Sequence, residues 1–190
     1  MTNKKEFQLQ KSFQLKRKDK SHEQKIDSKI KKLCSKINSK EEYYTTSSCS
    51  GRITLIKALK EKSKNVFLFK THTKISFFEL KKELQKAIKE YPNMIYFKQE
   101  SCILHVVCKD FTSAEKLLIK ARIAGWKRSG IIASKKRIVL ELMSTERLEL
   151  PIANKKKILV NDDFLKLLVK EANQRLNRVE KKIKKFEGLI

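Results

Sequence analysis

Residues 94–108 read Met-Ile-Tyr-Phe-Lys-Gln-Glu-Ser-Cys-Ile-Leu-His-Val-Val-Cys, and this stretch decides the class of fold. Its two β-forming runs, 94–97 and 103–108, lie on either side of a short polar break, which predicts two strands. Similar runs at 53–58 and 66–71 predict two more strands before them. The centre of the chain is therefore expected to form a sheet.

The run 103–108, together with the residue before it, contains the pattern Cys102-x-x-His105-x-x-Cys108, which resembles a metal-binding cluster. Successive side chains of a strand point to opposite faces, so both cysteines would share a face with Leu104 while His105 points the other way. A metal chelate needs its ligands to converge, and we therefore predict no metal site. The cysteines are expected to be small core residues, and a satisfied core histidine is an alternative for His105.

Helices are predicted on both sides of this stretch. Ser76 and Glu79 have capping-box spacing and predict a helix that ends before Pro92. Thr112 and Glu115 have the same spacing and predict another helix.

Apolar periodicity predicts further helices over 3–18, 26–37 and from 161 onward, and the stripe of the last one is long enough that its final turns are expected to protrude. Extended segments are predicted at 131–133, 138–142, 148–152 and 158–160. The predicted class is α+β, with a mixed or antiparallel sheet, flanking helices and basic helices at both termini. We expect one domain over 1–190, made of an N-terminal helical segment (1–40), an α+β core (43–160) and a C-terminal helix (161–190).

The charge of the chain is strongly positive, with 46 Lys and Arg against 21 Asp and Glu and a formal net charge of +25. Residues 1–40 carry a net charge of +9 and residues 155–190 a net charge of +6. This excess favours a polyanionic partner, although we attribute about half of it to a lysine-rich composition.

No apolar run approaches the roughly 20 residues of a membrane span, and the irregular spacing of four cysteines favours the cytoplasm.

Common nucleotide-binding motifs are missing from the sequence. It contains only four glycines and has neither G-x-G-x-x-G nor a P-loop, which excludes most glycine-rich phosphate cradles. The most unusual stretch, Tyr43 to Arg52, is dense in Ser and Thr and is expected to be a loop. Gly51 would let the backbone approach a ligand, and Arg52 would bind a carboxylate or phosphate. Local side-chain capping in a connecting loop is the alternative.

Several blocks of the sequence resemble a known family. They are Lys18-Asp-Lys-Ser21 with Ile26-Asp27, Tyr44-Thr-Thr-Ser-Ser-Cys-Ser-Gly-Arg52-Ile, Glu100-Ser-Cys-Ile-Leu-His105-Val, Ala121-Arg-Ile-Ala-Gly-Trp126-Lys-Arg-Ser-Gly130-Ile, Glu141-Leu-Met-Ser-Thr145, Leu148-Glu-Leu-Pro151 and Ala172-Asn173. Their order and content are similar to those of the tRNA wybutosine-synthesising methyltransferases of archaea and eukaryotes. The chain departs from the family at Ser101-Cys102, at Trp126, and at Met143, where an Arg is common.

The resemblance implies S-adenosylmethionine-dependent N-4 methylation of the 7-aminocarboxypropyl-demethylwyosine base beside the anticodon of phenylalanine tRNA, on a compact fold that is not a Rossmann fold. We expect the basic termini to bind the tRNA backbone, and Tyr43, Tyr44 or Trp126 to stack on the extruded base. A noncatalytic RNA-binding accessory protein and a purely structural basic protein are the alternatives.

The predicted site combines residues of the family blocks with polar side chains at strand ends or within strands. A methyl transfer needs in-line positioning of the nucleophile and a route for its proton. The predicted proton acceptors are His72, His105 and Asp19, and the predicted donor- or substrate-binding residues are Ser47, Ser48, Ser50, Gly51, Arg52, Glu100 and Glu141.

Overall fold

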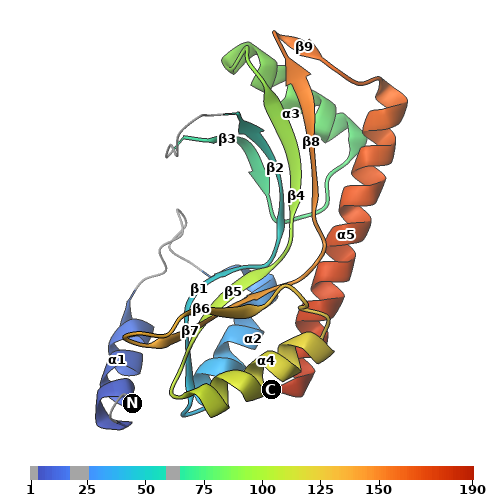
Figure 1. Ribbon diagram of the computed structural model, residues 1–190. Helices are drawn as coiled ribbons and strands as arrows, with labels where there is room; N and C mark the ends of the chain where they lie inside the picture. Colours follow the sequence, from blue (N-terminus) through green and yellow to red (C-terminus); the bar gives the residue numbers. More distant parts are fainter. Residues whose placement is uncertain (1–3, 18–25, 59–64) are drawn as a thin grey trace. The chain divides into compact units, whose positions relative to one another are not determined.

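The structure is a computed structural model that describes residues 4–17, 26–58 and 65–190. Within these residues the chain forms two compact units. Unit 1 comprises the described residues within 1–50, 102–145 and 179–190, and unit 2 comprises those within 51–101 and 146–178. The described helices and strands confirm the α+β class (Figure 1). The expectation of one domain over 1–190 stays a prediction.

Unit 1 is built on an antiparallel sheet with the strand order β1-β5-β7-β6. Its elements are α1 (Lys4–Lys16), α2 (Ser28–Ser39), β1 (Tyr43–Cys49), β5 (Ile103–Cys108), α4 (Phe111–Ile123), β6 (Gly130–Ala133), β7 (Ile138–Met143) and the C-terminal turns of α5 (Asp162–Leu189). Helices α2 and α4 and these α5 turns pack on one face of the sheet, and their apolar side chains form its core (Figure 1). We call this the core face.

Helix α1 covers part of the opposite face, which we call the outer face. Phe7 is only 2% exposed and packs against Tyr44 and Val107. The rings of Phe7 and Tyr44 lie 5.3 Å apart. Burial of one such aromatic side chain contributes roughly 1.5–3 kcal/mol, which fixes α1 to this end of the sheet.

Unit 2 is built on a second antiparallel sheet with the strand order β3-β2-β4-β8-β9. Its elements are β2 (Arg52–Lys57), β3 (Phe67–Thr71), α3 (Phe77–Glu90), β4 (Ile95–Glu100), β8 (Leu148–Asn154), β9 (Lys157–Ile158) and the α5 residues up to Arg178. The apolar faces of α3 and of this part of α5 pack on the sheet. Ser76 caps α3 by accepting a hydrogen bond from the Glu79 backbone N–H at 3.1 Å, as its spacing predicts.

Three expectations about individual elements are wrong. Residues 43–49 form strand β1 and not a loop, because they pair along their length with β5. Helix α4 begins at Phe111, and its N-cap is Asp110, whose carboxylate accepts a hydrogen bond from the Ser113 N–H at 2.7 Å; Thr112 is not the cap.

The last turns of α5 do not protrude. Val179, Ile183 and Phe186 are each at most 1% exposed and belong to the core of unit 1. The apolar stripe of α5 is long because its two halves serve the cores of two different units. In the described part of the chain, the helices are too short or too polar to span a bilayer.

Candidate active site

A polar row crosses the outer face of unit 1 on three neighbouring strands. Ser47 of β1 pairs with His105 of β5, and His105 pairs with Glu141 of β7. Side chains at directly paired positions lie on the same face of a sheet, so the register alone brings the three together. Ser47 Oγ lies 2.8 Å from His105 Nδ1, and His105 Nε2 lies 2.9 Å from Glu141 Oε2.

The chemistry of these partners assigns the protons in the row. An ionised carboxylate only accepts hydrogen bonds, so His105 donates from Nε2–H to Glu141. In the neutral ring Nδ1 is then the acceptor, and the hydroxyl of Ser47 donates to it. One tautomer therefore satisfies both contacts, and a proton that reaches Ser47 has a direct path to His105.

The row is accessible from outside the unit. Ser47 is exposed, and the side chains of His105 and Glu141 are 28% and 32% exposed. His105 is therefore not a core histidine, and the alternative raised by its apolar strand is wrong. Partial burial strengthens its two hydrogen bonds.

The core face of β5 has the opposite character. Cys102 and Cys108 are buried together with Leu104 and Val106. Burial, together with the nearby charge of Asp110, raises the pKa of the Cys108 thiol to about 12. The cysteines and His105 thus lie on opposite faces, as the strand period predicts.

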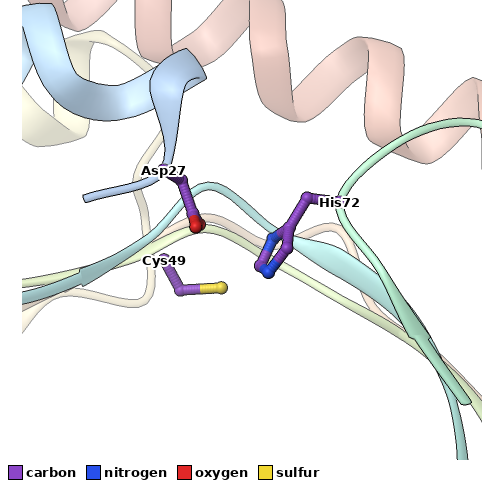
Figure 2. Close-up of side chains that lie close together, drawn as sticks. All are labelled: Asp27, Cys49 and His72. Atoms are coloured by element: carbon purple, nitrogen blue, oxygen red, sulfur yellow. The ribbon is translucent and has the colours of Figure 1, made fainter. Parts of the chain in front are cut away.

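Ser50, at the end of unit 1's first segment, is held by an acid that the sequence did not single out. The carboxylate of Asp27 accepts hydrogen bonds from the Ser50 N–H at 2.8 Å and from the Ser50 hydroxyl at 3.2 Å. Figure 2 shows the Asp27 side chain entering from the segment before α2, with Cys49 entering from the end of β1. Asp27 stands at the N-cap position of α2 but makes no side-chain cap bond there. Its place directly before a helical period was the available signal, and that signal indicates a cap.

The side chain of Ser48 points to the opposite face of the sheet from that of Ser47. It pairs with Leu104, a buried residue of the core face. Neighbouring residues of a strand alternate between faces, so Ser47 belongs to the polar row and Ser48 does not.

Unit 2 holds four of the predicted site residues, beginning with Gly51 and His72. Gly51 has a φ of 92°, in the left-handed region that favours glycine. Its carbonyl accepts a hydrogen bond from Nδ1 of His72 over 2.9 Å. A carbonyl cannot donate, so this contact places the proton of neutral His72 on Nδ1 and makes Nε2 the basic atom. His72, the third side chain labelled in Figure 2, follows strand β3.

Arg52 and Glu100 are the other two, and they form an ion pair across neighbouring strands. They are register partners on β2 and β4, and Arg52 Nε donates to Glu100 Oε2. The guanidinium carbon of Arg52 also lies 4.7 Å from the centre of the Phe67 ring. These contacts hold the planar fork of Arg52 in place, with its side chain still 27% exposed. Phe67 has no distinctive sequence signal beyond its place in a strand.

The three aromatic residues predicted to stack on a base have different environments. Tyr44 and Trp126 are 1% and 0% exposed, so the expectation that they contact a base is wrong. Tyr44 is covered by Phe7 of α1 on the outer face, and Trp126 packs in the core of unit 1 against Phe186. Tyr43 is half-buried, its hydroxyl donates to the Ser113 carbonyl, and burial raises its pKa to about 12.

The predicted site residues are thus divided between the units. Unit 1 brings Ser47, His105 and Glu141 into one row, with Ser48 and Ser50 on the same strand or directly after it. Unit 2 brings together Gly51 with His72 and Arg52 with Glu100. Asp19 lies outside the described residues.

The antiparallel α+β units differ from the Rossmann methyltransferases, and the polar row of unit 1 suits proton transfer. Comparison with known proteins identifies the class: the chain belongs to a methyltransferase family. The matching family model is described as Methyltransferase TYW3, and it matches residues 3–190. The resemblance seen in the sequence blocks is confirmed.

Relatives and solved structures agree with this assignment. A Thermococcus sibiricus protein named tRNA(Phe) 7-((3-amino-3-carboxypropyl)-4-demethylwyosine(37)-N(4))-methyltransferase is 38% identical over 168 residues, which cover 87% of this chain and 84% of the relative. A Danio rerio tRNA wybutosine-synthesizing protein 3 homolog is 36% identical over 190 residues, with 97% and 74% coverage. A solved structure from Pyrococcus horikoshii has a TM-score of 0.81 at 32% identity and covers 97% of this chain and 90% of its own.

Proposed function

We propose that this protein transfers the methyl group of S-adenosylmethionine to N-4 of the 7-aminocarboxypropyl-4-demethylwyosine base at position 37 of phenylalanine tRNA. The observation that carries the proposal is the family match along residues 3–190, to a family whose relatives are named for this reaction. The methyl acceptor lies in tRNA, and the cysteines Cys34, Cys49, Cys102 and Cys108 are not in disulfides, which supports a cytoplasmic location.

The chemical groups present fit such a methyl donor. S-adenosylmethionine supplies an electrophilic methyl group on a sulfonium, along with a ribose, an ammonium and a carboxylate. The carboxylate of Asp27 in unit 1 is a group that binds ribose hydroxyls or an ammonium. Considered separately, unit 2 offers the fork of Arg52, which suits a carboxylate and is held by Glu100 and Phe67.

The polar row of unit 1 supports a route for the proton. The N-4 nitrogen that gains the methyl group must lose a proton, because otherwise the product retains a positive charge. Ser47 would accept this proton as it passes its own to His105 Nδ1, while Glu141 orients the ring through Nε2. Glu141 is a positioning residue in this scheme, and Ser47 with His105 is the proton-transfer pair.

The test is methylation by the full-length protein. Precursor tRNA carrying the demethylwyosine base is incubated with methyl-labelled S-adenosylmethionine, and the digested nucleosides are identified by mass spectrometry. We expect one methyl group on N-4 of the tricyclic base and none on control tRNA that carries guanosine at the same position. Calorimetric titration with S-adenosylmethionine, with and without tRNA, separates this proposal from a noncatalytic accessory protein, which would bind the RNA but show no saturable binding of the methyl donor.

A further inference from the structure

A concave site lies in unit 1, and its lining does not include the residues of the polar row. It is a pocket of about 380 Å³ between the start of α4 and the turn that joins β6 to β7. Residues 109–112 line one side and residues 134–138 line the other. Ligand sites generally have volumes of about 300–1,000 Å³, so this pocket is large enough for part of a nucleotide.

The lining of this pocket is strongly basic. It contains Lys109, Lys135, Lys136 and Arg137 against a single acid, Asp110. The carboxylate of Asp110 is already engaged as the cap of α4, and hydrogen bonds from Ser113 lower its pKa. The pocket therefore carries an excess of three positive charges next to the positive end of a helix.

Some cations of the chain are neutralised by neighbouring acids. Lys29, Lys57 and Lys98, for example, each form an ion pair with a glutamate. Among residues 4–17, 26–58 and 65–190, none of the ion pairs found includes any of the four cations of the pocket. Residues 135–137 are also exposed. Their charges are consequently available to an anion.

An exposed aromatic ring stands among these charges. Phe111, the first residue of α4, is 60% exposed and lines the pocket. Within the described part of the chain it takes part in none of the ring-to-ring or cation–ring contacts. An aromatic face beside several cations is the arrangement that binds single-stranded nucleic acid, because the base stacks while the cations hold the phosphates.

We propose that this pocket binds an unpaired nucleotide of the tRNA substrate, with its base stacked on Phe111 and the flanking phosphates held by Lys135, Lys136 and Arg137. The inference rests on the proposed function for the identity of the RNA. The proposal places the main RNA contact in this pocket, and not in the polar row or on the terminal helices. Lysine charge supplies affinity here, and the stacked ring restricts binding to unpaired bases.

The test measures binding of a fluorescent tRNA(Phe) anticodon stem-loop to the full-length protein at a series of salt concentrations. The triple substitution Lys135→Ala/Lys136→Ala/Arg137→Ala should weaken binding at least about tenfold and reduce the slope of log K against log[salt] by about 2, because each phosphate contact on a single strand contributes about 0.7. Phe111→Ala should weaken binding about tenfold without changing the slope.

Matched controls come from α3 in unit 2. Lys82→Ala/Lys86→Ala/Lys89→Ala removes the same charge from another exposed surface, and Phe78→Ala removes a ring that is 78% exposed. Equal losses from the α3 and pocket triples would show that only net charge matters and would overturn the proposal. Equal binding of a fully paired RNA duplex, or an unchanged affinity in Phe111→Ala, would overturn the stacking role.

A methylation assay on precursor tRNA separates failure of this inference from failure of the proposed function. The pocket variants should raise KM for tRNA and leave kcat near that of the unaltered protein. If the protein methylates the base and the pocket variants have normal KM, the pocket assignment is wrong and the function stands. If no methylation occurs but the pocket variants still lose binding to the stem-loop, the function is wrong and the RNA site stands.

Discussion

Strand β5 has two faces with opposite character, and the contrast explains how one short strand supports both the fold and the proposed chemistry. On the core face, Leu104, Val106 and Cys108 are at most 2% exposed. On the outer face, His105 is partly exposed and linked to Ser47 and Glu141. Because side chains alternate along a strand, the core face fixes the register, and the register aligns the polar row.

The largest effect is expected from the outer face. His105→Ala removes the proposed proton acceptor and should lower the single-turnover rate of methyl transfer by about 10²- to 10⁴-fold. The urea midpoint should change little, because the side chain is partly exposed. Rates measured with saturating tRNA and methyl donor test this. Full activity in His105→Ala would exclude His105 as the proton acceptor, and loss of activity in a parallel His72→Ala variant would then assign that role to His72.

A substitution one residue away should give the reverse result. Leu104→Ala creates a cavity on the core face and should lower the free energy of unfolding by about 2–5 kcal/mol. The rate of methyl transfer per folded molecule should remain close to that of the unaltered protein. Urea denaturation followed by circular dichroism gives the stability. If Leu104→Ala instead abolished activity in the folded protein, the two faces would not be separable.

The reactivity of two cysteines measures the difference between the buried core face and the partly exposed end of β1 without a substitution. Burial raises the pKa of the Cys108 thiol to about 12, so at pH 8 it has almost no reactive thiolate. Cys49, which is partly exposed at the end of β1, should therefore react with iodoacetamide at least about tenfold faster. Peptide mass spectrometry over a time course measures both rates. The native pKa of Cys108 exceeds its unfolded value, so its contribution to stability is complete below about pH 8.5 and declines as the pH rises above it.

The smallest effect is expected at the end of β5, where the chain turns into the helix that covers the core face. Asp110→Ala removes the cap of α4 and should lower the free energy of unfolding by about 1 kcal/mol at pH 7. Hydrogen bonds from Ser113 lower the pKa of Asp110, so the unfolded chain takes up its proton first as the pH falls below about 4. The stability difference between the two proteins should shrink in that range. A difference that stayed constant down to pH 2 would contradict an ionised cap.

Local patterns gave the parts of the fold that depend only on neighbouring residues. The cap at Ser76 and the division of β5 between two faces were predictable because capping and alternation act over a few residues. The first residue of α4 was not predictable, because both Asp110 and Thr112 are good capping residues and only the backbone path decides which of them caps the helix. The sequence of strand β1 predicts a loop, since its hydroxyl residues lack an apolar period and become a strand only through pairing with β5.

Contacts between residues far apart in the sequence were not predictable in the candidate site either. Ser47, His105 and Glu141 were each singled out from the sequence, but their alignment depends on pairing between strands that are far apart in the chain. Tyr44 and Trp126 have the composition of base-stacking residues, and their burial depends on helices packed from elsewhere in the sequence. Asp27 resembled a helix cap, and its bond to Ser50 also spans a long sequence separation.

The family, the α+β class, the basic character and the available chemical groups follow from residue order and short-range periodicity alone. Which of those groups meet depends on how distant parts of the chain pack together. This packing aligned three polar residues on one face of a sheet, buried two of three candidate aromatic rings, and gathered Phe111 and four cations around one pocket. Side-chain contacts of this kind depend on strand register and helix packing, and both are set by interactions between distant parts of the chain.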